Sequence, residues 1–268
     1  MATEGGNNNP KQWFPLESNP TVMNKYMKKL GLNLEEYSYQ DIFSTEDWAL
    51  EMVPKPVLGV LLLFPITLEE EEFSIEQQDQ IDVNGQTVSE NVHFIKQTIG
   101  NACGTIGLLH SIVNSHAYHS QALFAPDSYL SRFVNSTRTL NPEAIADFLE
   151  EDEELETTHD EAAIEGQTEQ IMDVENHFIC FSHVDGQLYE LDGRKRFPIN
   201  HGATTADTLL EDASRAIQGF MNRQPGELRF TMVALCKAPP AEPIEEDGDE
   251  EEEDEEEGEG DVVENEQQ

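Results

Sequence analysis

The chain has 268 residues, enough for one sizeable domain, and 55 Asp and Glu against 15 Lys and Arg give it a formal net charge of −40. Residues 242–268 contain 17 acidic and no basic side chains, which leaves −23 of that charge on residues 1–241. Such a protein repels nucleic acid and anionic membranes, which excludes both as partners, and it favours basic partners.

The cysteines indicate a reducing compartment. Cys103, Cys180 and Cys236 are odd in number and widely spaced, which disfavours a disulfide scaffold. The N-terminal residues lack the apolar core of a signal peptide, and the longest apolar run, 57–64, is too short to span a bilayer. We therefore expect a monomeric cytoplasmic protein that also enters the nucleus.

The first half of the chain gives the following expected elements. Residues 1–10 are rich in Gly and Asn and predict disorder. A helical pattern then runs from Pro20 and ends at Gly31. The apolar run 57–64 predicts a central strand buried on both faces. The polar segment 69–92 shows only a turn signal, at Asn84-Gly85.

Apolar residues at helical spacing predict a helix from Cys103 to about Ser115. Further helices are predicted at 126–135, 142–149 and 205–222, and strands at 177–184, 187–191 and 228–236. The Asp185-Gly186 turn joins the first two strands as a hairpin. We expect Cys180, Cys236, Trp13 and Trp48 to pack in the core.

The segment between Glu150 and Asp173 is acidic, has little periodicity and lies inside the domain. Unstructured segments of this length are uncommon in compact domains and are either functional or disordered. A mobile cover over a site and an unordered insertion are both compatible with its composition.

Cys103 lies in a turn of small residues directly before an apolar-faced helix, in QTIGNACGTIGLLHS. The free N–H groups and dipole of a helix N-terminus favour a thiolate and can stabilise an oxyanion. Ala102 and Gly104 leave room for a substrate backbone. An inert cysteine at a tight helix start fits the local pattern equally well.

A thiol nucleophile needs a base and a group that orients the base. His177 begins one strand of the predicted hairpin and Asp192 follows the other, so the hairpin can bring them side by side. Each has a plainer interpretation, His177 as a strand-end residue and Asp192 as a turn residue before Gly193.

Several long segments resemble one family. QTIGNACGTIGLLHS is similar to the nucleophile motif of the ubiquitin carboxyl-terminal hydrolases, and HFICFSHVDGQLYELDGRKRFPINHG to their His and Asp motif. WFPLESNP, VPKPVLGVLLLFPIT, EGQT and ELRFTMVAL follow in family order. The resemblance covers about residues 11–237 and is closest to the small, single-domain members. It implies a catalytic domain at 11–238 with an α/β (α+β) papain-like fold, a central antiparallel sheet flanked by helices and a knotted backbone.

The resemblance also implies the chemistry of a thiol protease. Cys103 is expected to be the nucleophile, His177 the general base and acid, and Asp192 the group that orients the imidazole. Gln97 is expected to stabilise the oxyanion, with Asn101 as a further helper. The reaction is hydrolysis of small adducts or peptides from the C-terminal glycine of ubiquitin through a thioester. It uses no cofactor and no metal.

The partner implied by the resemblance is ubiquitin, with the modifier Nedd8 as a second substrate. Segment 150–173 corresponds to the family's crossover loop over the active site. Three stretches match ubiquitin-contacting regions: Pro15, Leu16, Glu17, Ser18, Asn19 and Pro20; Ala163, Ile164, Glu165, Gly166, Gln167, Thr168, Glu169 and Gln170; and Glu227, Leu228, Arg229, Phe230, Thr231 and Met232.

Two further features of the sequence are a pair of histidines and an acidic C-terminal segment. His116 and His119 have helical spacing but lack the Cys or carboxylate partners of a metal site. Residues 239–268 predict a disordered acidic tail. The tail supports two alternative hypotheses from another class: an interaction protein for basic partners such as histones, and a ubiquitin-binding module without turnover.

Overall fold

The computed structural model describes residues 11–115, 123–166 and 175–240. Within these ranges the strands form one sheet in the order β1-β6-β2-β3-β4-β5, and every paired neighbour is antiparallel. The strands are β1 (Tyr37–Ile42), β2 (Val57–Pro65), β3 (Asn176–Val184), β4 (Gln187–Leu191), β5 (Ile199–Ala203) and β6 (Thr231–Lys237). The predicted central antiparallel sheet is confirmed.

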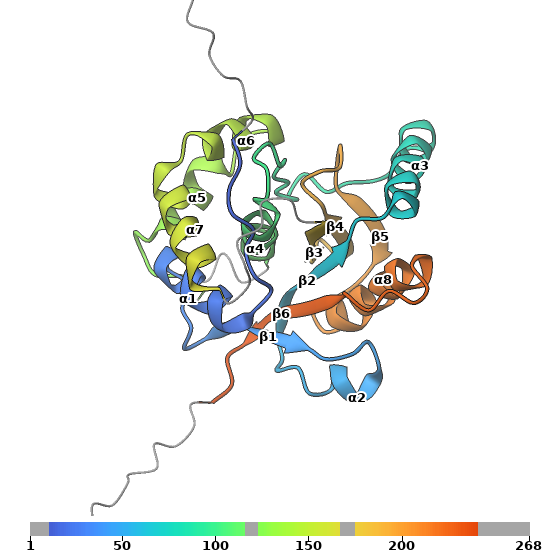
Figure 1. Cartoon of the computed structure of the whole chain (residues 1–268), viewed down its shortest axis with the longest axis horizontal. Coiled ribbons are helices and arrows are strands. Elements are labelled where there is room, and N and C mark those ends of the chain that lie inside the picture. Colours follow the sequence, from blue (N-terminus) through green and yellow to red (C-terminus); the bar gives the residue numbers. More distant parts are fainter. Residues whose placement is uncertain (1–10, 116–122, 167–174, 241–268) are drawn as a thin grey trace, which may run out of the picture.

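Helices cover both sides of this sheet. They are α1 (Pro20–Leu30), α2 (Asp47–Leu50), α3 (Leu68–Asn84), α4 (Cys103–Val113), α5 (Tyr129–Thr137), α6 (Pro142–Glu150), α7 (Glu153–Glu165) and α8 (Leu209–Arg223). Helices α1 and α4–α7 gather on one side of the sheet, whereas α3 and α8 lie on the other (Figure 1). No helix in the described ranges is both long and apolar enough to cross a membrane.

Strand β2 separates two hydrophobic cores. Leu61 packs into the core that α1, α4 and α5 share, whereas Val60, Leu62 and Phe64 point into the core under α8. The alternation follows from the two-residue period of a strand. Because β2 also pairs with β3 on one edge and β6 on the other, its continuous apolar sequence is buried on both faces, as predicted.

The structure confirms most of the elements predicted from periodicity. Helix α4 begins at Cys103, and the β3–β4 hairpin turns at Asp185-Gly186, with Val184 paired to Gln187. Helices α5 and α8 and strand β6 begin a few residues later than predicted, at Tyr129, Leu209 and Thr231. Strands β1 and β5 and the short helix α2 were not predicted.

Helix α3 was also not predicted, because its inner face is polar. Glu70 and Gln78 are buried, and Glu70 accepts from Arg223 of α8 at 2.7 Å. Thr67 caps the N-terminus by accepting from the backbone N–H of Glu70. The predicted turn at Gly85 is where the helix ends, with a positive φ of 77°.

The prediction that segment 150–173 lacks regular structure is wrong for residues 153–165, which form α7. Asp152 caps this helix by accepting from the N–H of Leu155 at 2.9 Å. Leu155, His159, Ala162 and Ala163 make a buried stripe at helical spacing. The histidine and small alanines in this stripe conceal the periodicity. Residues 167–174 lie outside the described residues, so the expected crossover loop stays a prediction.

Trp48 is not a core residue, contrary to prediction, because α2 leaves its side chain 59% exposed. Trp13, Cys180 and Cys236 are buried, as predicted. The expected disorder of residues 1–10, the acidic tail beyond residue 240, and His116 and His119 lie outside the described residues.

Candidate active site

Cys103 is the first residue of α4 and is only 8% exposed. Asn101, with a φ of 60°, turns the chain immediately before the helix. Among the residues that the structure describes, no side chain caps this N-terminus, so its first backbone N–H groups stay available close to the thiol. A Cβ on Gly104 would lie 2.9 Å from Cβ of Leu16, so only glycine allows the N-terminal segment to pass this close.

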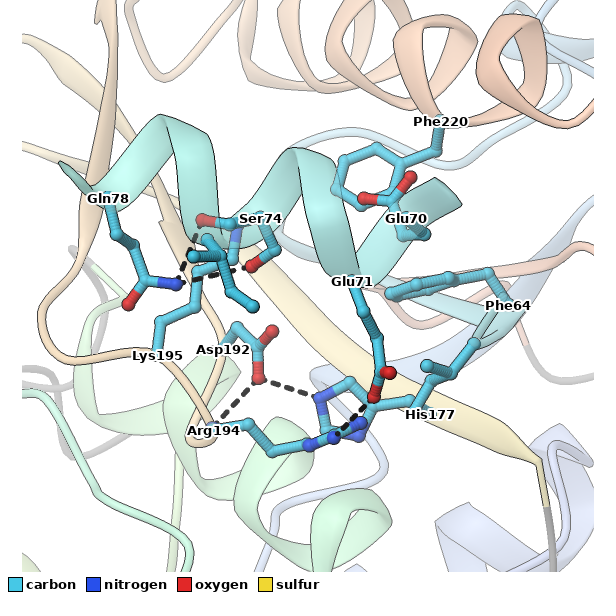
Figure 2. A pocket seen from close by; sticks show the side chains of 12 residues that line it. Phe64, Glu70, Glu71, Ser74, Gln78, His177, Asp192, Arg194, Lys195 and Phe220 are labelled. Carbon is cyan, nitrogen blue, oxygen red and sulfur yellow. Dashed lines mark hydrogen bonds and ion pairs between the residues drawn. The ribbon is translucent and has the colours of Figure 1, made fainter. Parts of the chain in front are cut away.

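His177 and Asp192 come from the β3–β4 hairpin and form a buried pair. His177 Nε2 donates to Asp192 Oδ1 at 2.7 Å, and the two residues are 3% and 7% exposed. The hairpin register, with Cys180 opposite Leu191, carries these strand ends together. The backbone N–H of Arg194 also donates to Asp192 Oδ1, at 2.9 Å. Figure 2 shows Asp192 between the ring of His177 and the turn that follows it.

The thiol of Cys103 and the ring of His177 interact directly. Burial raises the pKa of the Cys103 thiol, but a hydrogen bond with His177, its positive charge and backbone hydrogen bonds from Phe178 and Gly104 bring the pKa below its ordinary value. Since Nε2 of His177 is bonded to Asp192, its Nδ1 is the nitrogen left to face the thiol. The structure therefore brings together the three predicted residues.

The same three groups set the charge on the imidazole. Burial lowers the pKa of His177, but the carboxylate of Asp192 and the interaction with Cys103 outweigh burial and raise the pKa to about 9. Burial raises the pKa of Asp192, and the imidazolium and the charge of Lys195 bring it below its ordinary value. The arrangement favours a thiolate beside an imidazolium.

Gln97 and Asn101 lie beside the start of α4. The side-chain amide of Gln97 donates to the carbonyl of Ile99 at 3.2 Å, while its Oε1 is buried and has no partner within the described part of the chain. The backbone N–H of Gln97 donates to the carbonyl of Gly193, which ties this loop to the Asp192 turn. Asn101 donates its amide to the carbonyl of Trp13 at 3.0 Å, so it holds the N-terminal segment.

Two of the predicted ubiquitin-contacting stretches lie against one another. Leu16 is buried and packs on Gly104, and Asn19 caps α1, so part of the first stretch supports the fold. At the end of α7, Ile164 is 65% exposed, and Gly166 lies so close to Glu17 that a Cβ there would be 2.7 Å from its carboxylate. Gln167, Thr168, Glu169 and Gln170 lie outside the described residues.

The third stretch lines a groove before and at the start of β6. Leu228 is 89% exposed, and Phe43, which the sequence did not single out, is 69% exposed on the same groove. Phe230, which also lines the groove, is half-buried, and Met232 is buried. Arg229 and Glu227 form a two-point ion pair beside it. The groove therefore has exposed apolar side chains with a charged pair at its rim.

A pocket of about 250 Å³ reaches His177 and Asp192 from the α3 side of the sheet. Its walls include Phe64 and Phe220, and an ion pair between Glu71 and Arg194, 3.2 Å apart, borders it (Figure 2). Cys103 does not line this pocket. The pocket therefore lies on the side of the His177–Asp192 pair away from the thiol. Within the described residues no group of three His, Cys, Asp or Glu side chains is arranged to hold a metal ion.

A helix that begins with a thiol, beside a β-hairpin that carries an imidazole and is followed by a carboxylate, is the arrangement of a papain-like cysteine peptidase. The family model described as "Ubiquitin carboxyl-terminal hydrolase, family 1" matches residues 13–222. The chain belongs to this family of cysteine peptidases, and it is a deubiquitinating enzyme of that class.

The chain is similar to several named members of the family. It is 47% identical to ubiquitin carboxyl-terminal hydrolase 3 of Arabidopsis thaliana over 88% of this chain and 99% of that protein. It is 44% identical to human ubiquitin carboxyl-terminal hydrolase isozyme L1 over 85% of this chain and 99% of that protein. The structure also resembles the Trichinella spiralis UCH37 catalytic domain bound to ubiquitin vinyl methyl ester, with a TM-score of 0.65, 21% identity and coverage of 84% of this chain and 95% of that one. This likeness confirms the predicted fold.

Proposed function

We propose that this enzyme hydrolyses small adducts or peptides from the C-terminal glycine of ubiquitin, with Cys103 as nucleophile, His177 as general base and acid, and Asp192 as the group that orients His177. The observation that carries the proposal is the convergence of these three buried side chains from α4 and the β3–β4 hairpin. These residues are separated in the sequence, and a thiol, an imidazole and a carboxylate that converge in the fold have the arrangement of a nucleophile, its base and the group that orients the base.

The reaction follows from the ionisation of these groups. The Cys103 thiolate attacks the carbonyl carbon of the terminal glycine, and the carbonyl oxygen takes up the negative charge. His177, as imidazolium, gives its proton to the leaving amine, and the C–N bond breaks to leave a thioester. Neutral His177 then accepts a proton from water, whose oxygen attacks the thioester, and the thiolate leaves with the acid released.

The oxyanion is stabilised by donors at the start of α4. The backbone N–H of Cys103 belongs to an uncapped helix N-terminus. The amide of Gln97 has two N–H groups, and only one is needed for its bond to the carbonyl of Ile99. The second can be directed to the oxyanion. Asn101 acts less directly, because its amide holds the Trp13 carbonyl.

Ubiquitin binding is supported by the exposed side chains of two predicted stretches. Leu228 and Phe43 offer apolar area in the groove before β6, and Ile164 offers it at the end of α7. Exposed apolar side chains rimmed by charged ones are typical of protein-binding sites. The net charge of −40 favours encounter with a basic surface or a basic peptide leaving group.

A ubiquitin molecule with an electrophile in place of its last glycine tests the proposal. We expect one covalent adduct per chain, which peptide mass spectrometry assigns to Cys103. Burial raises the pKa of Cys180 and of Cys236 to about 12, so neither should compete. A free electrophile of the same chemistry at equal concentration is the control and should react far more slowly.

The proposal is wrong if ubiquitin carrying the electrophile gives no adduct, or if the adduct lies on Cys180 or Cys236. A Cys103→Ala protein, expected to stay unmodified, distinguishes adducts on that thiol from adducts on other nucleophiles.

A further inference from the structure

His159 of α7 is a buried polar residue that the reaction does not use. It is completely inaccessible to solvent, and both nitrogens of its ring are engaged. Nε2 donates to the backbone carbonyl of Phe14 at 2.7 Å, and Nδ1 accepts from the hydroxyl of Thr105 at 2.7 Å. Thr105 belongs to α4 and is two residues from Cys103.

The donors and acceptors of these hydrogen bonds follow a fixed order across α7, α4 and α1. Phe14 can only accept at its carbonyl, so His159 carries its proton on Nε2 and Nδ1 is an acceptor. The Thr105 hydroxyl then donates to Nδ1 and accepts from the hydroxyl of Tyr26, which lies 3.0 Å away on α1. Burial lowers the pKa of His159, in keeping with a neutral ring. Each polar group in this series of hydrogen bonds has a partner, which favours a single arrangement of the segments.

His159 lies where the two ubiquitin-facing segments meet the nucleophile helix. The carbonyl it holds belongs to the residue before Pro15, where the first of these stretches begins. The ring also packs on Trp13, with centroids 4.5 Å apart. Six residues after His159, α7 ends at Glu165, next to Gly166 and its contact with Glu17. One side chain therefore links α4, the N-terminal segment and the helix that leads into the expected crossover loop.

The ion pairs of α7 with Lys29 and Lys11 are exposed or half-exposed. Lys29 of α1 pairs with Glu161 and Glu165 at 3.2 Å each, and Lys11 pairs with Glu156 at 2.7 Å. Exposed ion pairs contribute little and weaken with salt. A buried donor or acceptor that loses its partner is costly by comparison. The His159 bonds are therefore buried polar contacts that join α7 to the N-terminal segment and to α4.

We propose that His159 is a positioning residue that holds the N-terminal segment and α7 in the arrangement that binds ubiquitin, without taking part in the reaction. The inference rests on the proposed function, since the two segments matter only if they contact ubiquitin. It assigns to His159 an effect on KM and on ubiquitin affinity, and none on the reactivity of the thiol.

The test compares His159→Leu with His159→Gln. Leucine fills the site but leaves the Phe14 carbonyl without this donor and the Thr105 hydroxyl without its acceptor, whereas glutamine can donate to the first and accept from the second. With a ubiquitin–fluorophore amide as substrate, we expect His159→Leu to raise KM about tenfold, as for the loss of positioning hydrogen bonds, with kcat within about twofold. His159→Gln should recover most of the loss, and alkylation of Cys103 by iodoacetamide should be unchanged in both.

Two further variants separate positioning from general stability. Ile145→Ala removes buried side-chain atoms from α6, away from the hydrogen-bonded residues, and should lower the melting temperature without changing KM. Thr105→Val removes the hydroxyl that is bonded to His159 and to Tyr26 but keeps the bond from His159 to the Phe14 carbonyl, so it should raise KM less than His159→Leu does. If His159→Leu does not fold, Thr105→Val and His159→Gln decide: an unchanged KM in Thr105→Val contradicts the inference.

Ubiquitin affinity, measured by calorimetry on the same variants carrying Cys103→Ala, keeps the inference separate from the proposed function. If the parent protein binds ubiquitin but hydrolyses nothing, the proposed function fails, and the affinities still test His159. The inference is contradicted if His159→Leu binds ubiquitin as tightly as its parent, if Ile145→Ala weakens binding equally, or if kcat falls while KM stays constant.

Discussion

A His177→Ala enzyme should lose roughly four orders of magnitude in kcat toward a ubiquitin–fluorophore amide, as expected when a catalytic triad loses its base. Two effects combine. The thiol loses the hydrogen bond and charge that lower its pKa, so less thiolate is present at neutral pH. The leaving amine also loses the imidazolium that protonates it. KM should change little, because the exposed groove residue Leu228 and the end of α7 are untouched.

His183→Ala is a matched control for this measurement. His183 lies on the same strand, and its ring accepts from the backbone N–H of Gly186 in the hairpin turn, so its loss perturbs β3 without removing a member of the triad. We expect kcat within about twofold of the parent, since a substitution away from the reacting groups costs little. A His177→Ala enzyme that keeps a tenth or more of the parent kcat would disprove the assigned role.

Replacing Lys195 with methionine should lower the free energy of unfolding by about 3–5 kcal/mol, because it removes one partner of a buried ion pair. Lys195, in the turn after Asp192, is paired with Glu190 of β4, and the two side chains are 5% and 1% exposed. Lys195 also donates to Gln77 of α3 at 3.0 Å, and His201 lies 2.8 Å from Glu190. Denaturation by urea at pH 7 measures the loss.

The loss should also depend on pH. Burial raises the pKa of Glu190, but Lys195 and His201 outweigh it and lower the pKa to about 2, so this carboxylate stabilises the parent above its unfolded pKa and stops doing so as pH falls toward about 2. Without Lys195, burial dominates and the carboxylate takes up a proton more easily. The difference in the free energy of unfolding between the parent and Lys195→Met should therefore become smaller from pH 7 to about pH 4.

An exposed ion pair provides the matched control. Lys55 pairs with Glu211 at 2.8 Å, with side chains 52% and 38% exposed, so Lys55→Met should cost less than about 1 kcal/mol. If Lys195→Met cost no more than this control, Glu190 would not be a buried carboxylate that depends on Lys195.

The triad could be predicted because its signals are local. A cysteine among small residues marks the start of α4, and the two-residue Asp185-Gly186 turn fixes the register that places His177 beside Asp192. The direct contact between His177 and Cys103 is not local, because α4 and β3 are distant in the chain. It was expected from the family resemblance alone.

Elements with polar buried faces could not be predicted from periodicity. Helix α3 buries Glu70 and Gln78, whose partners Arg223 and Arg196 are far along the chain. Helix α7 buries His159, whose partners are in α4 and the N-terminal segment. Only the spacing of Leu155, His159 and Ala162 could have revealed α7. The exposure of Trp48 likewise depends on where α2 lies, which composition does not specify.

The central claim is that Cys103 and His177 form a thiolate–imidazolium pair in the free enzyme. The rate at which iodoacetamide alkylates Cys103, measured from pH 4 to pH 10 and assigned by peptide mass spectrometry, tests it directly. The lowered thiol pKa predicts that reactivity rises at a lower pH than for an ordinary thiol, and the His177 pKa of about 9 predicts a second change in alkaline solution. A single rise centred near the ordinary thiol pKa, identical in the parent and in His177→Ala, would contradict the account.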